Sequence, residues 1–147
     1  MRTVITTENA PAPAAPLSQG IRKGPVLQVS GQLPLDPATG AVVGTTVAEQ
    51  TAQTLRNVTS ALKAAGACLE DVVMLRVYLT DPAHLPELNE AYAAAVGGPF
   101  PTRTTVYMRQ PRPSVGSGAR RMSSRASMWK ACQGRRLRDQ PILVAWS

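Results

Sequence analysis

Few side chains in this sequence could carry out covalent chemistry. Among its 147 residues there is one histidine, His84, and there are two cysteines, Cys68 and Cys132. Any Ser-His-Asp or Cys-His arrangement would therefore have to use His84, and a zinc site of the usual Cys and His type lacks ligands. We interpret His84 as a first-turn helix residue and Cys68 as a small apolar residue. The composition thus speaks against most metal and nucleophilic chemistry.

Arginine offers a different chemistry, the binding of anions. Arg103 follows Pro101 and Thr102, and a guanidinium group can hold a carboxylate through two parallel hydrogen bonds, which a lysine would not reproduce. From the residue type alone, a surface or interface arginine is the more common interpretation.

The net charge of +7 is unevenly distributed. Residues 1–108 carry seven basic and eight acidic side chains, whereas residues 109–147 carry nine basic side chains and one acidic one. We therefore expect a near-neutral domain over 1–108 and a basic tail over 109–147, mostly disordered because its prolines, glycines, serines and arginines show no apolar periodicity. Without a signal peptide or a membrane-length apolar run, we expect a cytoplasmic protein.

The elements that position these side chains follow from hydrophobic periodicity. Residues 46–65 are predicted to form a helix, with Thr45 or Thr46 as its cap and Gly66 at its end. Strands are predicted at 26–30 and 41–43, which the turn at 36–40 joins into a hairpin, and at 72–79 and 104–108. A second helix is predicted at 85–95. The order β-β-α-β-α-β indicates an α+β fold with one sheet under two helices.

Several short motifs follow one another along this domain: TENAP (7–11), PLSQG (16–20), VSGQLP (29–34), DPATG (36–40), QTLRNV (53–58), LNEAY (88–92) and FPTRT (100–104). In this order and spacing the chain resembles the Rid family, reactive intermediate deaminases formerly named the YjgF family, over about residues 3–108. The resemblance implies a chorismate mutase-like fold of the Bacillus type, homotrimers with sites between subunits, and no metal or organic cofactor. It also implies hydrolysis of enamines and imines, such as 2-aminoacrylate and 2-iminopropanoate, to 2-keto acids and ammonia.

The resemblance implies a set of site residues as well. Arg103 matches the family arginine and would bind the substrate carboxylate. Ser30 and Gly31 match a loop where a backbone N–H approaches the ligand, which glycine permits, and Asn89 matches a position facing the cleft. Thr105 stands where many members have a cysteine. Ordinary structural roles stay open for these residues: a strand end, an exposed helix amide and, as the favoured interpretation of Thr105, a strand threonine.

The sequence departs from the family at two points. Leu17 stands where many members have a tyrosine, which removes a hydroxyl from the cleft wall. Family members also end in a strand with a glutamate that is thought to polarise the attacking water, but no acidic residue lies between Arg103 and Asp139. We expect the final strand to be missing and catalysis to be impaired. A shifted reading frame after about Met108 would explain the change, and a genuine tail is the alternative.

Two other functions stay open. The basic tail would bind nucleic acid in a salt-dependent manner, although it contains no recognised motif. Alternatively, a non-catalytic member of the family would bind small carboxylates without turning them over.

Overall fold

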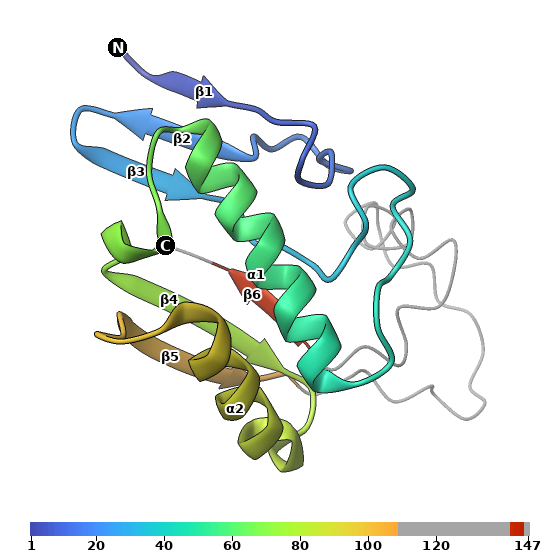
Figure 1. Ribbon diagram of the computed structural model, residues 1–147. Helices are drawn as coiled ribbons and strands as arrows, with labels where there is room; N and C mark the ends of the chain where they lie inside the picture. The colour runs from blue at the N-terminus through green and yellow to red at the C-terminus, as the bar shows by residue number, and fades with distance from the viewer. Residues whose placement is uncertain (109–141, 146–147) are drawn as a thin grey trace, which may run out of the picture.

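The computed structural model describes residues 1–108 and 142–145. Its elements in chain order are β1 (Thr3–Ile5), β2 (Gly20–Lys23), β3 (Val26–Val29), α1 (Val47–Ala64), η1 (Leu69–Asp71), β4 (Met74–Leu79), η2 (Pro82–His84), α2 (Leu85–Val96), β5 (Thr102–Tyr107) and β6 (Ile142–Ala145). Strands and helices are mixed along the chain, which confirms the predicted α+β class (Figure 1). None of the helices among the described residues is both long and apolar enough to span a membrane.

The strands form two three-stranded sheets, one with the order β1-β2-β3 and one with the order β5-β4-β6. β4 pairs with β5 in parallel and with β6 antiparallel. Because parallel neighbours need a long crossover connection, the chain passes through α2 between β4 and β5. Both helices lie on the same side of the strands in Figure 1. One face of the sheets is therefore covered by helices.

Helix α1 begins and ends almost where its sequence predicts. The side chain of Thr46 accepts a hydrogen bond from the backbone N–H of Glu49, and the Glu49 carboxylate accepts one from the N–H of Thr46. This capping box satisfies two amide groups that would otherwise lack partners at the helix start. The helix ends at Ala64, before Gly66, whose φ of +71° suits glycine.

The hydrophobic core lies between the helices and β4. Alternate residues of β4 are buried, because successive side chains of a strand point to opposite faces. Leu75 and Leu79 from β4 pack in one cluster with Leu62 from α1 and Leu88 from α2. These four side chains are completely buried, so both helices are anchored on the same strand.

The predicted hairpin between residues 26–30 and 41–43 is wrong. β3 pairs instead with β2 through a tight turn at Gly24, where φ is +57°. The turn at 36–40 does bring the chain back, but only an isolated bridge joins Leu35 to Val42. The carbonyl groups of Leu33 and Leu35 accept hydrogen bonds from the Asn57 side chain of α1. Side chains of the helix therefore take the place of a ladder between strands.

The expectation that the final strand is missing is also wrong. Ile142–Ala145, with the sequence ILVA, forms β6, which is antiparallel to β4 and lies between β3 and β4 in Figure 1. Without it, one edge of β4 would expose a row of unpaired backbone N–H and C=O groups, and the backbone of β6 pairs with that edge. The remainder of the predicted tail, residues 109–141 and 146–147, lies outside the described residues.

Candidate functional site

Arg103 lies where β5 meets α2. In the parallel register its Cα partner on β4 is the buried Leu75, so the two side chains share the helix-covered face of the sheet. One terminal nitrogen of the guanidinium, Nη2, donates a hydrogen bond of 2.7 Å to Oδ1 of Asn89. Arg103 itself is half-buried, and Asn89 is exposed. The strand thus brings this arginine against the outer part of α2.

Tyr92 lies beneath the same guanidinium group. The Arg103 Cζ atom is 5.0 Å from the centre of the Tyr92 ring, which is within the range of a cation–π interaction. Asn89 and Tyr92 are three positions apart on α2, so they lie on one face of the helix. Arg103 therefore meets α2 at two points, an amide oxygen at one edge of its guanidinium and an aromatic ring under its face.

Tyr92 is buried, with 6% of its surface exposed. Burial raises the pKa of its hydroxyl, and the nearby Arg103 charge offsets part of that rise. Among the described residues the hydroxyl has no hydrogen-bond partner. Its ring packs at 6.0 Å from that of Phe100, with the planes tilted by 35°. Tyr92 therefore keeps its proton at neutral pH and is a neutral aromatic surface for Arg103.

Several N–H donors of the Arg103 guanidinium have no acceptor among the described residues. An arginine side chain has five N–H groups, and Asn89 is the hydrogen-bond acceptor that the described residues supply to Arg103. No carboxylate among these residues lies within ion-pair distance of it. A half-buried cation with unused, coplanar donors is suited to bind a carboxylate in two-point geometry.

The remaining predicted site residues divide between two places. Thr105 is half-buried and two positions after Arg103, so it lies on the same face of β5. Ser30 and Gly31 follow β3 in the other sheet, and Leu17 is 52% exposed in the loop before β2. Within the described part of the chain, no hydrogen bond joins these three residues to Arg103.

Ser30 has a structural task in this chain. Its hydroxyl donates a 2.6 Å hydrogen bond to the carbonyl of Ser18, and its backbone N–H donates one of 2.9 Å to the carbonyl of Gln19. Gln19 is buried, and its side-chain amide in turn bonds the loop from Thr7 to Pro11. The PLSQG and TENAP motifs therefore hold the loops beside Ser30 in place.

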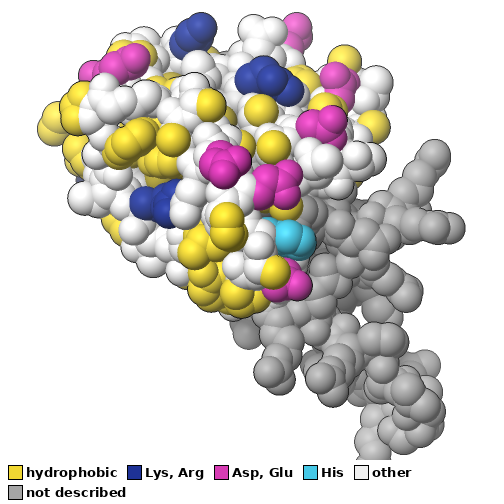
Figure 2. Space-filling view, turned by 60° about the horizontal axis from the view of Figure 1, so that its bottom comes forward, with side chains coloured by type: hydrophobic (Ala, Val, Ile, Leu, Met, Phe, Trp, Pro, Cys, Tyr) yellow, Lys and Arg dark blue, Asp and Glu magenta, His cyan; other side chains and the backbone are white. Residues whose placement is uncertain are grey.

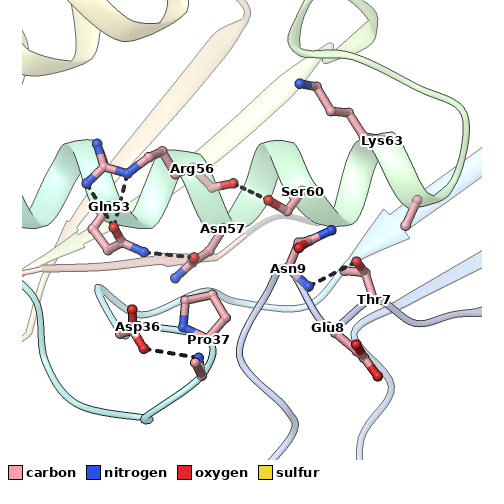
Figure 3. Close-up of a pocket in the computed structure, with 12 residues that line it drawn as sticks. Thr7, Glu8, Asn9, Asp36, Pro37, Gln53, Arg56, Asn57, Ser60 and Lys63 are labelled. Carbon is pink, nitrogen blue, oxygen red and sulfur yellow. Dashed lines mark hydrogen bonds between the residues drawn. The ribbon is translucent and has the colours of Figure 1, made fainter.

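A concave region of about 820 Å³, which the sequence does not indicate, lies away from Arg103. It opens between α1, the N-terminal loop and the turn at 36–40, as Figure 3 shows. Its Gln53 and Asn57 side chains point toward each other and hydrogen-bond at 3.1 Å, while Gln53 also accepts two bonds from Arg56. These amides are committed to the fold, so the QTLRNV motif is structural here.

Neither the histidine nor the described cysteine forms a reactive site. Cys68 is exposed, not packed as a small apolar residue. Hydrogen bonds to Glu70 and Asp71 raise the pKa of its thiol, which disfavours the reactive thiolate. His84 is not a first-turn residue of α2, because it ends η2 and precedes Leu85 as the N-cap, where it is half-buried. The described residues contain no group of three His, Cys, Asp or Glu side chains that could hold a metal ion.

Comparison with known proteins gives a consistent set of relatives. The family model described as endoribonuclease L-PSP matches residues 7–115. A RutC family protein of Saccharolobus solfataricus is 45% identical over 113 residues, which are 76% of this chain and 90% of that protein. A 2-iminobutanoate/2-iminopropanoate deaminase of Mus musculus is 38% identical over 103 residues, 70% of this chain and 76% of the mouse protein.

Solved structures agree with the fold. RidA of a Psychrobacter species is 34% identical, with a TM-score of 0.71 over 75% of this chain and 89% of that chain. The YjgF gene product of E. coli is 29% identical, with a TM-score of 0.71 over 98% of this chain and 95% of its own. The fold is thus the chorismate mutase-like fold of these proteins, as predicted.

Proposed function

The chain belongs to the Rid family, and from this premise we propose that it hydrolyses small 2-imino acids and their enamine forms to 2-keto acids and ammonia. The observation that carries the proposal is the guanidinium of Arg103, held by Asn89 and Tyr92 with unused donors. The names of the mouse relative and of a chloroplast Reactive Intermediate Deaminase A of Arabidopsis thaliana, 40% identical over 104 residues, support the same chemistry.

Arg103 binds the carboxylate of the imino acid in this mechanism. The paired hydrogen bonds fix the plane of the substrate, because a guanidinium and a carboxylate match in geometry. The adjacent C=N carbon is then oriented for attack by water. Water adds to that carbon, the nitrogen takes up protons, and the C–N bond breaks to release ammonia and leave the 2-keto acid. The imine is already electrophilic, so positioning supplies most of the rate gain.

This chain lacks the glutamate that would activate the attacking water. The family glutamate belongs on the last strand, but β6 consists of Ile, Leu, Val and Ala. Loss of a general acid–base group commonly lowers a rate by about 10²- to 10⁴-fold. We therefore propose that turnover is slow relative to family members that have the glutamate, while carboxylate binding at Arg103 is retained.

The complete site requires more than one copy of the chain. Ser30, Gly31 and Leu17 lie in loops beside the sheet β1-β2-β3, whereas Arg103 lies in the other sheet, and the sheet face opposite the helices carries the half-exposed Tyr78. We propose a homotrimer in which this face is covered and the loops of one subunit meet Arg103 of the next. A cytoplasmic location is part of the proposal, because the Cys68 thiol is free and disulfides are rare there.

The test is direct hydrolysis of freshly generated 2-iminopropanoate. An amino acid oxidase produces the imine from alanine, and semicarbazide traps what remains as an absorbing semicarbazone. The wild-type chain lowers the semicarbazone yield and raises pyruvate, and Arg103→Ala abolishes the effect. Arg56→Ala is the matched control, because Arg56 is exposed and its side chain bonds only Gln53 among the described residues. Its activity equals that of the wild type.

Either of two results would contradict the deaminase proposal and favour another function. Saturable binding of 2-ketobutyrate that depends on Arg103, without any acceleration of imine hydrolysis, would make the chain a carboxylate-binding protein. Salt-dependent RNA binding without either property would favour nucleic-acid binding through the basic residues after Met108. Sedimentation analysis tests the assembly separately, since a trimer has three times the 15.6 kDa mass of the chain.

A further inference from the structure

We propose that Tyr92 is a positioning residue for substrate binding: the face of its ring holds the Arg103 guanidinium in the orientation that receives a carboxylate. This proposal rests on the function proposed for Arg103. It concerns the ring alone, and it assigns no task to the Tyr92 hydroxyl. In the sequence Tyr92 reads as an ordinary core or interface residue of α2.

The contact geometry leaves the guanidinium little freedom. Asn89 Oδ1 accepts a hydrogen bond of 2.7 Å from Nη2, and the Cζ atom lies over the Tyr92 ring at 5.0 Å from its centre. An edge contact alone would let the group rotate about the hydrogen bond, and a face contact alone would let it slide across the ring. Together the two contacts restrict the guanidinium more than either contact alone.

The Tyr92 ring, which we call the platform for Arg103, is itself held in place by its neighbours. Tyr92 is buried in the core cluster that includes Leu88, one residue before Asn89. The Phe100 ring packs against it at 6.0 Å. A long arginine side chain loses conformational freedom when it binds a ligand. Because α2 already restricts Arg103, part of that loss occurs on folding and no longer weakens substrate binding.

The hydroxyl of Tyr92 allows the ring to be tested by itself. It is buried and has no hydrogen-bond partner among the described residues, so Tyr92→Phe keeps the aromatic face and removes only an unused group. Tyr92→Leu keeps a smaller, buried apolar side chain and removes the aromatic face. The two variants therefore separate the cation–π contact from simple packing.

The expected effect falls on binding and not on the chemical step. Arg103 holds the carboxylate alike in the substrate and in the transition state, and such uniform binding changes KM more than kcat. Loss of a cation–π contact weakens an interaction by about 3- to 30-fold. We expect Tyr92→Leu to raise KM for 2-iminopropanoate and Kd for 2-ketobutyrate within this range. Its kcat stays within twofold, and Tyr92→Phe matches the wild type in all three.

A spectroscopic measurement makes the test independent of turnover. A proton above an aromatic ring is shifted upfield, so the side-chain N–H resonance of Arg103 in the full chain reports the contact. Figure 2, which turns the α2 end of the molecule toward the viewer, shows that hydrophobic and charged side chains are interspersed on this surface. The Arg103 resonance is assigned by comparison with Arg103→Ala, in which it disappears. The shift is retained in Tyr92→Phe and lost in Tyr92→Leu.

The outcomes are distinguishable from failure of the proposed function. If the wild type hydrolyses no imine but 2-ketobutyrate binding still weakens in Tyr92→Leu, the platform stands and the deaminase proposal falls. If Tyr92→Leu is folded by circular dichroism and keeps both the wild-type Kd and KM, the platform is refuted. Equal weakening in Tyr92→Phe and Tyr92→Leu also refutes it, because the hydroxyl would then be the group that matters. If Tyr92→Leu does not fold, the absence of an upfield shift at Arg103 in the wild type decides against the platform.

Discussion

Arg103→Lys is the sharpest perturbation of the proposed site, because it preserves the charge and changes only the geometry. Arg103 bonds Asn89 through one terminal nitrogen and rests on the Tyr92 ring, while its other N–H groups are left for a ligand. A lysine ammonium is compact and sits on a flexible stem. It can attract a carboxylate, but it cannot present two parallel donors in one plane.

The magnitude follows from the number of bonds lost. A two-point guanidinium–carboxylate contact becomes a single contact, so one hydrogen bond to a charged group disappears. Such a bond contributes about 1.5–3 kcal/mol. Since each 1.36 kcal/mol is a factor of ten, kcat/KM falls by about 10- to 150-fold in Arg103→Lys. Stability changes little, because Arg103 is half-buried and has no ion-pair partner among the described residues.

The assay compares kcat/KM for 2-iminopropanoate in the wild type, Arg103→Lys and Arg103→Ala, with urea unfolding as the control for folding. The alanine variant loses the attraction as well as the geometry, so its activity falls below that of the lysine variant. A lysine variant within twofold of the wild type would refute the two-point geometry. It would mean that Arg103 acts only as a point charge.

Three further predictions test the scaffold and the basic residues. Asn57→Ala lowers the free energy of unfolding in urea by about 2–4 kcal/mol, because it removes three hydrogen bonds of a buried amide, to the carbonyl groups of Leu33 and Leu35 and from Gln53; a loss below about 1 kcal/mol would contradict this. The backbone N–H groups of the helix cap hold the pKa of Glu49 below its usual 4.5. Its stabilising effect is therefore complete above pH 4.5 and is lost as the pH falls through the lower folded value, so the Tm difference between the wild type and Glu49→Gln vanishes at low pH instead of staying constant. Changing the arginines of residues 109–147 to glutamine leaves imine hydrolysis within about threefold and removes any salt-dependent RNA binding; a larger loss of hydrolysis would give these residues a part in the reaction.

The sequence alone predicts those parts of the fold that depend on neighbours in the chain. The periodicity at 46–65 and the threonine cap predict α1, since helical hydrogen bonds and capping involve residues only a few positions apart. Residues 85–95 likewise become α2. The order and spacing of the motifs identify the family, which the comparisons confirm. The family in turn implies the chorismate mutase-like fold.

Other features depend on which distant segments meet. In the sequence the amides of Gln53 and Asn57 fall outside the apolar face of the helix, but in the structure they are buried and bond the backbone of the 33–35 segment. β2 contains Ile21 between Gly20 and Arg22, too little alternation to indicate a strand. It becomes one because β3 folds back on it. β6 is decided in the same way, by pairing with the open edge of β4.

The candidate site depends on both local sequence and long-range contacts. Motif matching points to Arg103 and Asn89, and the structure joins them by a hydrogen bond; their roles in catalysis stay predictions. Nothing local marks Tyr92 as a companion of Arg103, because it is eleven positions before Arg103. The two meet only because α2 crosses over to place β5 parallel to β4. Local sequence determines which segments are helices and which family the chain belongs to. The register between distant segments determines which side chains meet, and only the folded chain contains that information.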